Sequence, residues 1–106
     1  MPRRKCRKDG HHNALSDCAR DLGWQVWDTW QHAQYTPGWP DALWIGYGVI
    51  LGEYKLPGEP LTPAEATFRA LCDAAQPGLY QVFETVDDVL RVTELCRAET
   101  IMERRG

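Results

Sequence analysis

Apolar and polar positions recur along the chain with two different periods, which together predict three helices and four strands. Apolar residues three or four positions apart, the spacing of a helix face, run through 11–23, 61–75 and 87–105. Alternating positions or short apolar runs, which are typical of strands, occupy 24–30, 40–46, 49–55 and 78–86. The element order α-β-β-β-α-β-α predicts a mixed α/β sheet. Because the last strand follows a helix, at least one parallel strand pair is expected.

Two of the predicted helices carry recognisable end signals. Gly23 follows the first apolar helical pattern and is a fitting C-terminal stop. Thr62, Pro63 and Glu65 have the spacing of a capping box with proline at the first helical position. Residues 1–9 are polar and are predicted to form a basic N-terminal arm, outside a single domain that spans residues 10–106.

Composition narrows the class of protein. A chain of 106 residues with 43% apolar and 25% charged residues is typical of one soluble globular domain. The net charge of −3 argues against a protein that coats DNA, yet five basic residues gather near the N-terminus, where they either contact phosphates or form a solvated tail. These residues are Arg3, Arg4, Lys5, Arg7 and Lys8.

The four cysteines form no C-x-x-C pair, so no zinc site is expected. No signal peptide precedes them, so reduced cytosolic thiols are expected. No apolar run is long enough to cross a membrane.

The most strand-like segment carries unexpected charges. It reads PGWPDALWIGYGVILGEYK, from Pro37 to Lys55. If residues 46–48 form a three-residue loop, Asp41 lies opposite Glu53, and Lys55 shares their face of the sheet. A two-residue loop would shift the pairing by one position and place Asp41 and Glu53 on opposite faces.

Two adjacent carboxylates repel each other, and a divalent cation such as Mg²⁺ or Mn²⁺ removes that conflict. Water held by such a cation can attack a phosphodiester, and a neighbouring Lys55 would orient that water, deprotonate it or stabilise the phosphate charge. The alternative is structural. Asp41 would then be a turn residue, and Glu53 and Lys55 would pair on the solvent side of an edge strand.

Four segments together resemble a known family. The segment GWPD, followed after eleven residues by EYK, is similar to the signature of PD-(D/E)XK nucleases. LTPAEATF resembles the helix start of their VRR-NUC and Holliday-junction-resolvase-like phage branch. RKDGHHNALSDCARDLGWQV and GLYQVFETVDDVL resemble the opening helix and the closing strand and helix of those proteins. The resemblance covers about Arg3 to Leu90 and implies a restriction-endonuclease-like core.

The resemblance also implies roles for individual residues. Asp41 and Glu53 match the metal-binding carboxylates of the family, and Lys55 matches its catalytic lysine. The main-chain carbonyl of Tyr54 falls where the family often adds a metal contact. Glu65 occupies a position where relatives carry Gln or Glu near the site, although its capping role is a sufficient structural explanation. Both interpretations of Glu65 stay open at this stage.

The first helix departs from the family pattern, because no Glu stands where many members place a further metal ligand. His12 and Asp17 are the accessory candidates there. Trp39 and the basic arm are candidates for DNA contacts. The resemblance thus implies a Mg²⁺- or Mn²⁺-dependent DNA endonuclease, selective for branched DNA and homodimeric, encoded by a phage or prophage and acting in the host cytoplasm. The missing Glu motivates a competing hypothesis, a catalytically weak or inactive nuclease-fold module that binds nucleic acid or a protein partner.

Overall fold

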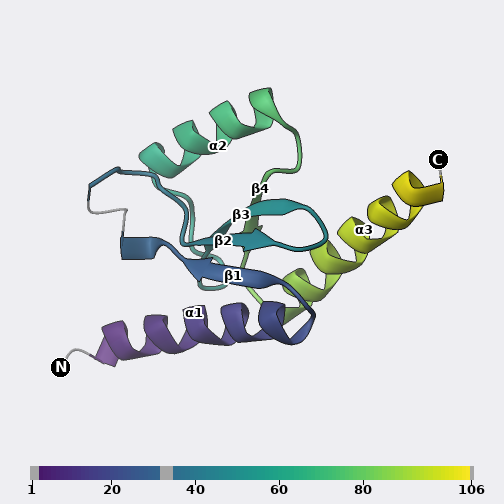
Figure 1. Cartoon of the computed structure of the whole chain (residues 1–106). Helices are drawn as coiled ribbons and strands as arrows, with labels where there is room; N and C mark the ends of the chain where they lie inside the picture. Colours follow the sequence, from purple (N-terminus) through teal and green to yellow (C-terminus); the bar gives the residue numbers. More distant parts are fainter. Residues whose placement is uncertain (1–2, 32–34, 106) are drawn as a thin grey trace.

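The described residues form seven elements in the predicted order α-β-β-β-α-β-α (Figure 1). The structure is a computed structural model that describes residues 3–31 and 35–105, and the side chains of residues 10–31 and 35–102. The elements are α1 (Arg3–Asp21), β1 (Gln25–Asp28), β2 (Ala42–Ile45), β3 (Val49–Tyr54), α2 (Pro63–Ala75), β4 (Tyr80–Phe83) and α3 (Val86–Arg105).

The four strands form one mixed sheet in the order β1-β2-β3-β4. The first three strands pair antiparallel, and β3 pairs with β4 in parallel because α2 carries the chain back across the sheet. The predicted parallel pairing is therefore confirmed.

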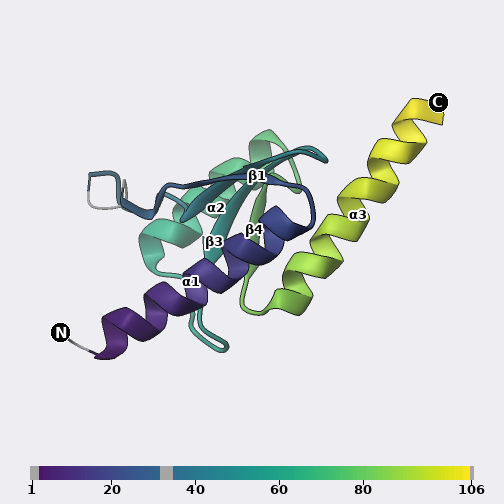
Figure 2. The same ribbon diagram turned by 60° about the horizontal axis from the view of Figure 1, so that its bottom comes forward.

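Helices lie on both faces of the sheet, α1 and α3 on one side and α2 on the other (Figure 2). The main core fills the space between the sheet and α1 and α3. Trp44 and Phe83 stack there with ring centroids 4.4 Å apart, and Trp24 packs beside Trp44. Trp44 is fully buried in this core.

Helix α1 begins at Arg3, eight residues before the predicted helix start at His11, so the backbone of the predicted arm is helical from Arg3 onward. Arginine and lysine have high helix propensity, and this explains how the basic segment continues the helix. The predicted apolar stripes also need correction, because Leu71, Leu90 and Leu95 are exposed. The C-terminal end of α3 extends beyond the sheet (Figure 2).

Three cysteines with described side chains, Cys18, Cys72 and Cys96, are free thiols. Burial, followed by a nearby carboxylate, raises the pKa of each thiol. These side chains are therefore neutral at pH 7 and act as packing groups. No helix in the described part of the chain is long and apolar enough to cross a membrane.

Candidate active site

The hairpin of β2 and β3 places the two predicted carboxylates close to each other. Ile45 pairs with Val49 and Ala42 with Gly52, so residues 46–48 form the three-residue loop. Asp41 directly precedes β2 and lies close enough to Glu53 for its charge and hydrogen bond to act on that side chain. The main-chain N–H of Asp41 donates to the carbonyl of Gly52 at 3.0 Å. The geometry therefore excludes the two-residue loop and gives Asp41 and Glu53 one face of the sheet.

The Asp41 carboxylate is held by the strand opposite it. The main-chain N–H of Tyr54 donates to Oδ2 of Asp41 at 2.7 Å. This bond fixes the orientation of the Asp41 carboxylate beside β3 before any ligand binds. Asp41 is also partly exposed, whereas Glu53 and Lys55 are buried, with 2% and 3% of their surface accessible. The cluster is therefore reached from solvent through Asp41.

Glu53 is buried next to other acids. Burial, and then the charge and hydrogen bond of Asp41, raises its pKa to about 10. Without a cation, Glu53 therefore holds a proton at neutral pH, because two carboxylates this close cannot both be charged in a dry site. A solvent-facing edge position, the structural alternative for Glu53, is excluded by its burial.

The Lys55 ammonium lies among three carboxylates. Its Nζ is 2.6 Å from Oε1 of Glu65, and it is 3.9 Å from Oε2 of Glu53 and from Oε2 of Glu59. Burial alone would lower the pKa of Lys55, but the hydrogen bond and charge of Glu65, with smaller effects of Glu53 and Glu59, raise it. Lys55 is therefore a buried cation at neutral pH.

Glu65 both caps α2 and binds Lys55, so the two interpretations of this residue are compatible. Its Oε1 accepts from the main-chain N–H of Thr62 at 2.8 Å, and its own N–H donates to the Thr62 hydroxyl at 3.2 Å. The same Oε1 accepts from Lys55. Burial raises the pKa of Glu65, but the bonds from Lys55 and Thr62 outweigh burial and lower it. The first turn of α2 thus forms one wall of the site.

The loop before β2 packs tightly against the first turn of α2. Gly38 has φ +89°, and a Cβ atom there would lie 2.5 Å from the carbonyl oxygen of Ala64. Only glycine allows this approach. Trp39, the next residue, packs edge-on against Phe68 of α2 at 5.8 Å between ring centroids. The predicted DNA contact of Trp39 stays a prediction, and the structure gives the half-buried ring a packing role.

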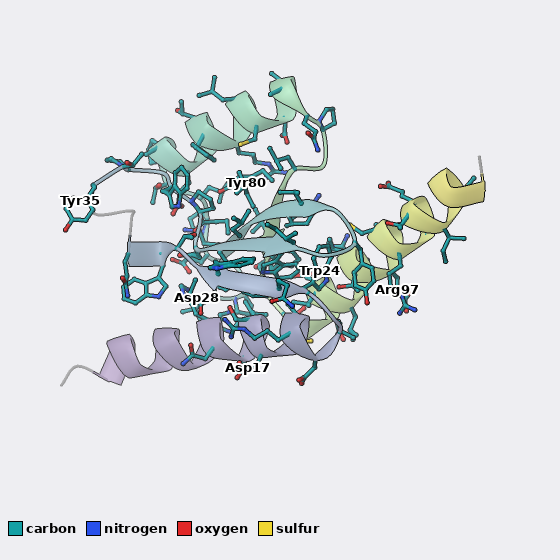
Figure 3. The ribbon with its side chains drawn as sticks, viewed as in Figure 1. Asp17, Trp24, Asp28, Tyr35, Tyr80 and Arg97 are labelled. Carbon is teal, nitrogen blue, oxygen red and sulfur yellow. The ribbon has the colours of Figure 1, made fainter. Side chains whose placement is uncertain are left out.

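Tyr80 of β4 also belongs to the site, and sequence reasoning missed it. Its hydroxyl donates to Oε1 of Glu53 at 3.4 Å, and its ring lies 6.1 Å from Phe68. Figure 3 shows Tyr80 beneath α2. The parallel pairing of Leu51 with Tyr80 creates this contact. No short-range pattern in the sequence specifies that register.

The described side chains of α1 bring imidazoles, not a carboxylate, to the back of β3. The ring N–H of His11 donates to the carbonyl of Lys55 at 2.9 Å, and the ring of His12 packs edge-on against Tyr54 at 5.3 Å. Asp17 is exposed, pairs with Arg20 at 3.3 Å and lies across the sheet from Tyr80 (Figure 3). The structure therefore does not join Asp17 to the cluster, and His12 packs against Tyr54, whose main-chain N–H binds Asp41.

The donor set is compatible with a hard divalent cation. Among the described residues, no group of three His, Cys, Asp or Glu side chains is arranged to hold a metal ion. Mg²⁺, however, is usually bound by one or two carboxylates and keeps several waters. Asp41 and protonated Glu53 form such a pair, and a cation would replace the Glu53 proton as the compensating positive charge.

A separate hollow lies away from these carboxylates. A cavity of about 300 Å³ opens between the β2–β3 turn and α3, lined among others by Tyr47, Val49, Leu95 and Cys96. Among the described residues that line it, Glu99 is the single acidic one. A cavity alone does not identify a catalytic site, and the paired carboxylates and the buried lysine lie at the other end of the sheet.

No protein-family model matches the chain, and neither a curated protein nor a solved structure shows significant similarity to it. The nuclease interpretation therefore rests on the motifs and on the geometry of the charged cluster.

Proposed function

We propose that this protein is a divalent-metal-dependent DNA endonuclease whose active site is the cluster of Asp41, Glu53 and Lys55. The observation that carries the proposal is the raised pKa and burial of Glu53 beside Asp41, with a buried ammonium 3.9 Å away. Strongly shifted, mutually coupled ionisable groups are typical of catalytic sites. Their order along the hairpin is that of the PD-(D/E)XK motif.

The carboxylates of Asp41 and Glu53, with the main-chain carbonyl of Tyr54, would hold Mg²⁺ or Mn²⁺. When bound, the ion supplies an activated water and neutralises charge on the phosphodiester. The protein orients Asp41 in advance through the N–H of Tyr54, so little rearrangement is needed.

Lys55 acts as a cation in this proposal. Because its pKa is raised, the ammonium keeps its proton at neutral pH and is suited to bind a phosphate oxygen as negative charge develops. The same shift disfavours the other expected role, deprotonation of water. Glu65 holds Lys55 in place at 2.6 Å, and the capping box fixes Glu65 in turn.

The finer parts of the proposal rest on the family resemblance. They are selectivity for branched DNA, a homodimer that presents two active sites, and a phage or prophage gene whose product acts in the host cytoplasm. The basic residues at the start of α1 suit a role in phosphate binding. Their backbone belongs to the end of α1 that extends past the sheet (Figure 1).

The test is cleavage of branched, flapped and linear DNA in Mn²⁺, Mg²⁺ or EDTA. We expect metal-dependent cleavage that falls about 10²- to 10³-fold in Lys55→Ala, because a charge-stabilising donor is lost. Asp41→Asn should lose cleavage and also Mn²⁺-dependent thermal stabilisation, since it removes a ligand. Asp73→Asn, which removes an exposed carboxylate of α2, is the matched control and should behave as wild type.

The structure also favours one competing function, a nuclease-fold module without catalysis. Three carboxylates surround Lys55, and the described side chains of α1 contribute no carboxylate to the cluster. DNA binding without cleavage in either metal, unchanged by Lys55→Ala and Asp41→Asn, would establish this alternative and overturn the endonuclease proposal.

A further inference from the structure

Half of the sheet face that carries the candidate site is left open. Directly paired residues point to the same side, so Trp27, Leu43, Leu51 and Tyr80 form one row across the four strands. Phe68 of α2 packs on the Tyr80 end of this row. At the other end Trp27 is 51% exposed. Among the described residues, the β1–β2 side of this face therefore has no helix covering Trp27.

The open area continues along the hairpin. Gln25, Ile45 and Val49 form the next row, and Ile45 and Val49 are 42% and 46% exposed. We define the open sheet face as Trp27, Leu43, Ile45, Val49 and Leu51. These five residues are uncharged and apolar in a chain with 25% charged residues. An apolar area of this kind on a small domain indicates a binding surface.

The open sheet face borders the candidate active site. The row of Leu43 and Leu51 lies two residues along the strands from Asp41 and Glu53, a distance of about 7 Å. That distance is close to the spacing of successive nucleotides in an extended strand. A ligand whose phosphate lies at Asp41 therefore places its neighbouring groups over Trp27, Leu43 and Leu51.

The apolar and aromatic side chains of the open sheet face favour one class of ligand. An apolar surface with an exposed indole does not bind phosphates, but it stacks bases, and stacking tolerates every base. Bases are available for stacking only where they are unpaired. Four-stranded sheets with helices behind them bind single-stranded nucleic acid in this way. Two more exposed aromatic residues, Trp30 and Tyr35, follow β1 along the chain.

We propose that the open sheet face binds a single-stranded segment of DNA adjacent to the phosphodiester that the site cleaves, with Trp27 as the principal stacking residue. The proposal rests on the proposed endonuclease function and specifies its substrate: DNA with unpaired bases beside the cut, such as a flap or a splayed arm. Continuity with the carboxylates favours DNA over a second copy of the chain as occupant.

The test measures binding of a twelve-nucleotide oligo(dT) to the full chain in EDTA, by fluorescence anisotropy and tryptophan quenching. We expect Trp27→Ala to weaken binding about tenfold, because one base loses its stacking partner. Trp27→Phe should retain most of the affinity. Leu90→Ala is the matched control, since Leu90 is 42% exposed on α3, the helix on the other side of the sheet. Circular dichroism and melting temperature verify that each variant folds.

Three outcomes separate this inference from the proposed function. Equal oligo(dT) affinity of wild type and Trp27→Ala overturns the inference, even if metal-dependent cleavage of duplex DNA is found. A shift from dimer to monomer in Trp27→Ala, with unchanged oligo(dT) affinity, also overturns it and assigns the face to a second copy. Trp27-dependent binding without cleavage in Mn²⁺ or Mg²⁺ supports the face as a single-strand site and overturns the endonuclease function instead.

Discussion

At the scale of single residues, the structure changes the meaning of three charges. The sequence is compatible with Asp41, Glu53 and Lys55 forming either a metal site or a polar strand edge, and in the structure Glu53 and Lys55 are almost completely buried. Burial makes their protonation states interdependent, so that Glu53 stays neutral while Lys55 stays charged. A divalent cation can therefore bind at this site only if Glu53 loses its proton.

The Glu53 proton predicts how stability depends on pH in the absence of metal. The usual pKa of Glu53 is 4.5 and the folded value is about 10, so between these values the folded state holds a proton that the unfolded state has lost. The contribution of Glu53 is therefore full below pH 4.5 and declines as the pH rises toward 10. The raised pKa of Lys55 and the lowered pKa of Glu65 act outside this window.

We expect Glu53→Gln, which mimics the neutral acid, to lose less stability than wild type between pH 5 and pH 9, by about 1 kcal/mol or more. The measurement is the free energy of unfolding from urea titrations in EDTA. Glu94→Gln, an exposed substitution on α3, should follow the wild-type curve. Parallel curves for Glu53→Gln and wild type would show that Glu53 is ionised in the folded protein.

At the scale of elements, three pieces of the fold assemble the site. The hairpin supplies the charges on one face, the first turn of α2 supplies Glu65, and the loop at Gly38 seals the space between them. The capping box stabilises α2 and also orients the partner of Lys55. The capping of α2 and the geometry of the candidate site are therefore coupled.

Gly38→Ala tests this coupling. The added Cβ would meet the Ala64 carbonyl oxygen at 2.5 Å, in addition to the strain of φ +89°. We expect a loss of about 2–3 kcal/mol in unfolding free energy, together with weaker Mn²⁺ stabilisation, because the loop carries Asp41.

Gly58→Ala is the matched control for that experiment. Gly58 has a similar φ of +83°, but a Cβ atom added there would have no described atom within 4 Å, so only backbone strain of about 1 kcal/mol is expected. Equal effects of the two substitutions, or a Gly38→Ala variant with wild-type response to Mn²⁺, would contradict a specific role of the contact with α2.

At the scale of the whole molecule, charge is distributed unevenly along its length. The chain ends lie at opposite ends of the molecule, with the start of α1 beyond the site end of the sheet and the end of α3 beyond the hairpin turn (Figure 1). The net charge is −3, although the segment from Arg3 to Lys8 has five basic residues. A DNA strand that reaches the site is therefore expected to meet positive charge from α1 and apolar surface from the sheet.

The salt dependence of DNA binding tests this uneven distribution of charge. We expect the double variant Arg3→Gln, Arg4→Gln to lower the slope of log affinity for oligo(dT) against log salt by roughly 1.4, about 0.7 for each lost phosphate contact. The double variant Arg104→Gln, Arg105→Gln removes the same charge at the other end and should leave the slope unchanged. Identical slopes in the two variants would show that the basic residues of α1 act only through net charge.

Local sequence patterns determined the element order, the position of the hairpin turn and the α2 cap. Each of these depends on residues a few positions apart, such as Gly46 and Gly48 in the turn or Thr62 and Glu65 in the cap. The proximity of Asp41 and Glu53 depended on the length of that loop, which the sequence left open between two and three residues and the structure fixed at three. Helix length was less predictable, because α1 continues to Arg3 through polar residues that can extend a helix but show no apolar periodicity to mark its start.

Only the tertiary structure decided the partners and charge states of these residues. Tyr80 reaches Glu53 through a parallel register, Glu65 reaches Lys55 across a loop, and α1 brings His11 to the back of β3. These contacts join segments that are distant in the chain, and their register depends on how helices pack on a twisted sheet. Burial, which sets the pKa of Glu53, is likewise a property of the packed molecule.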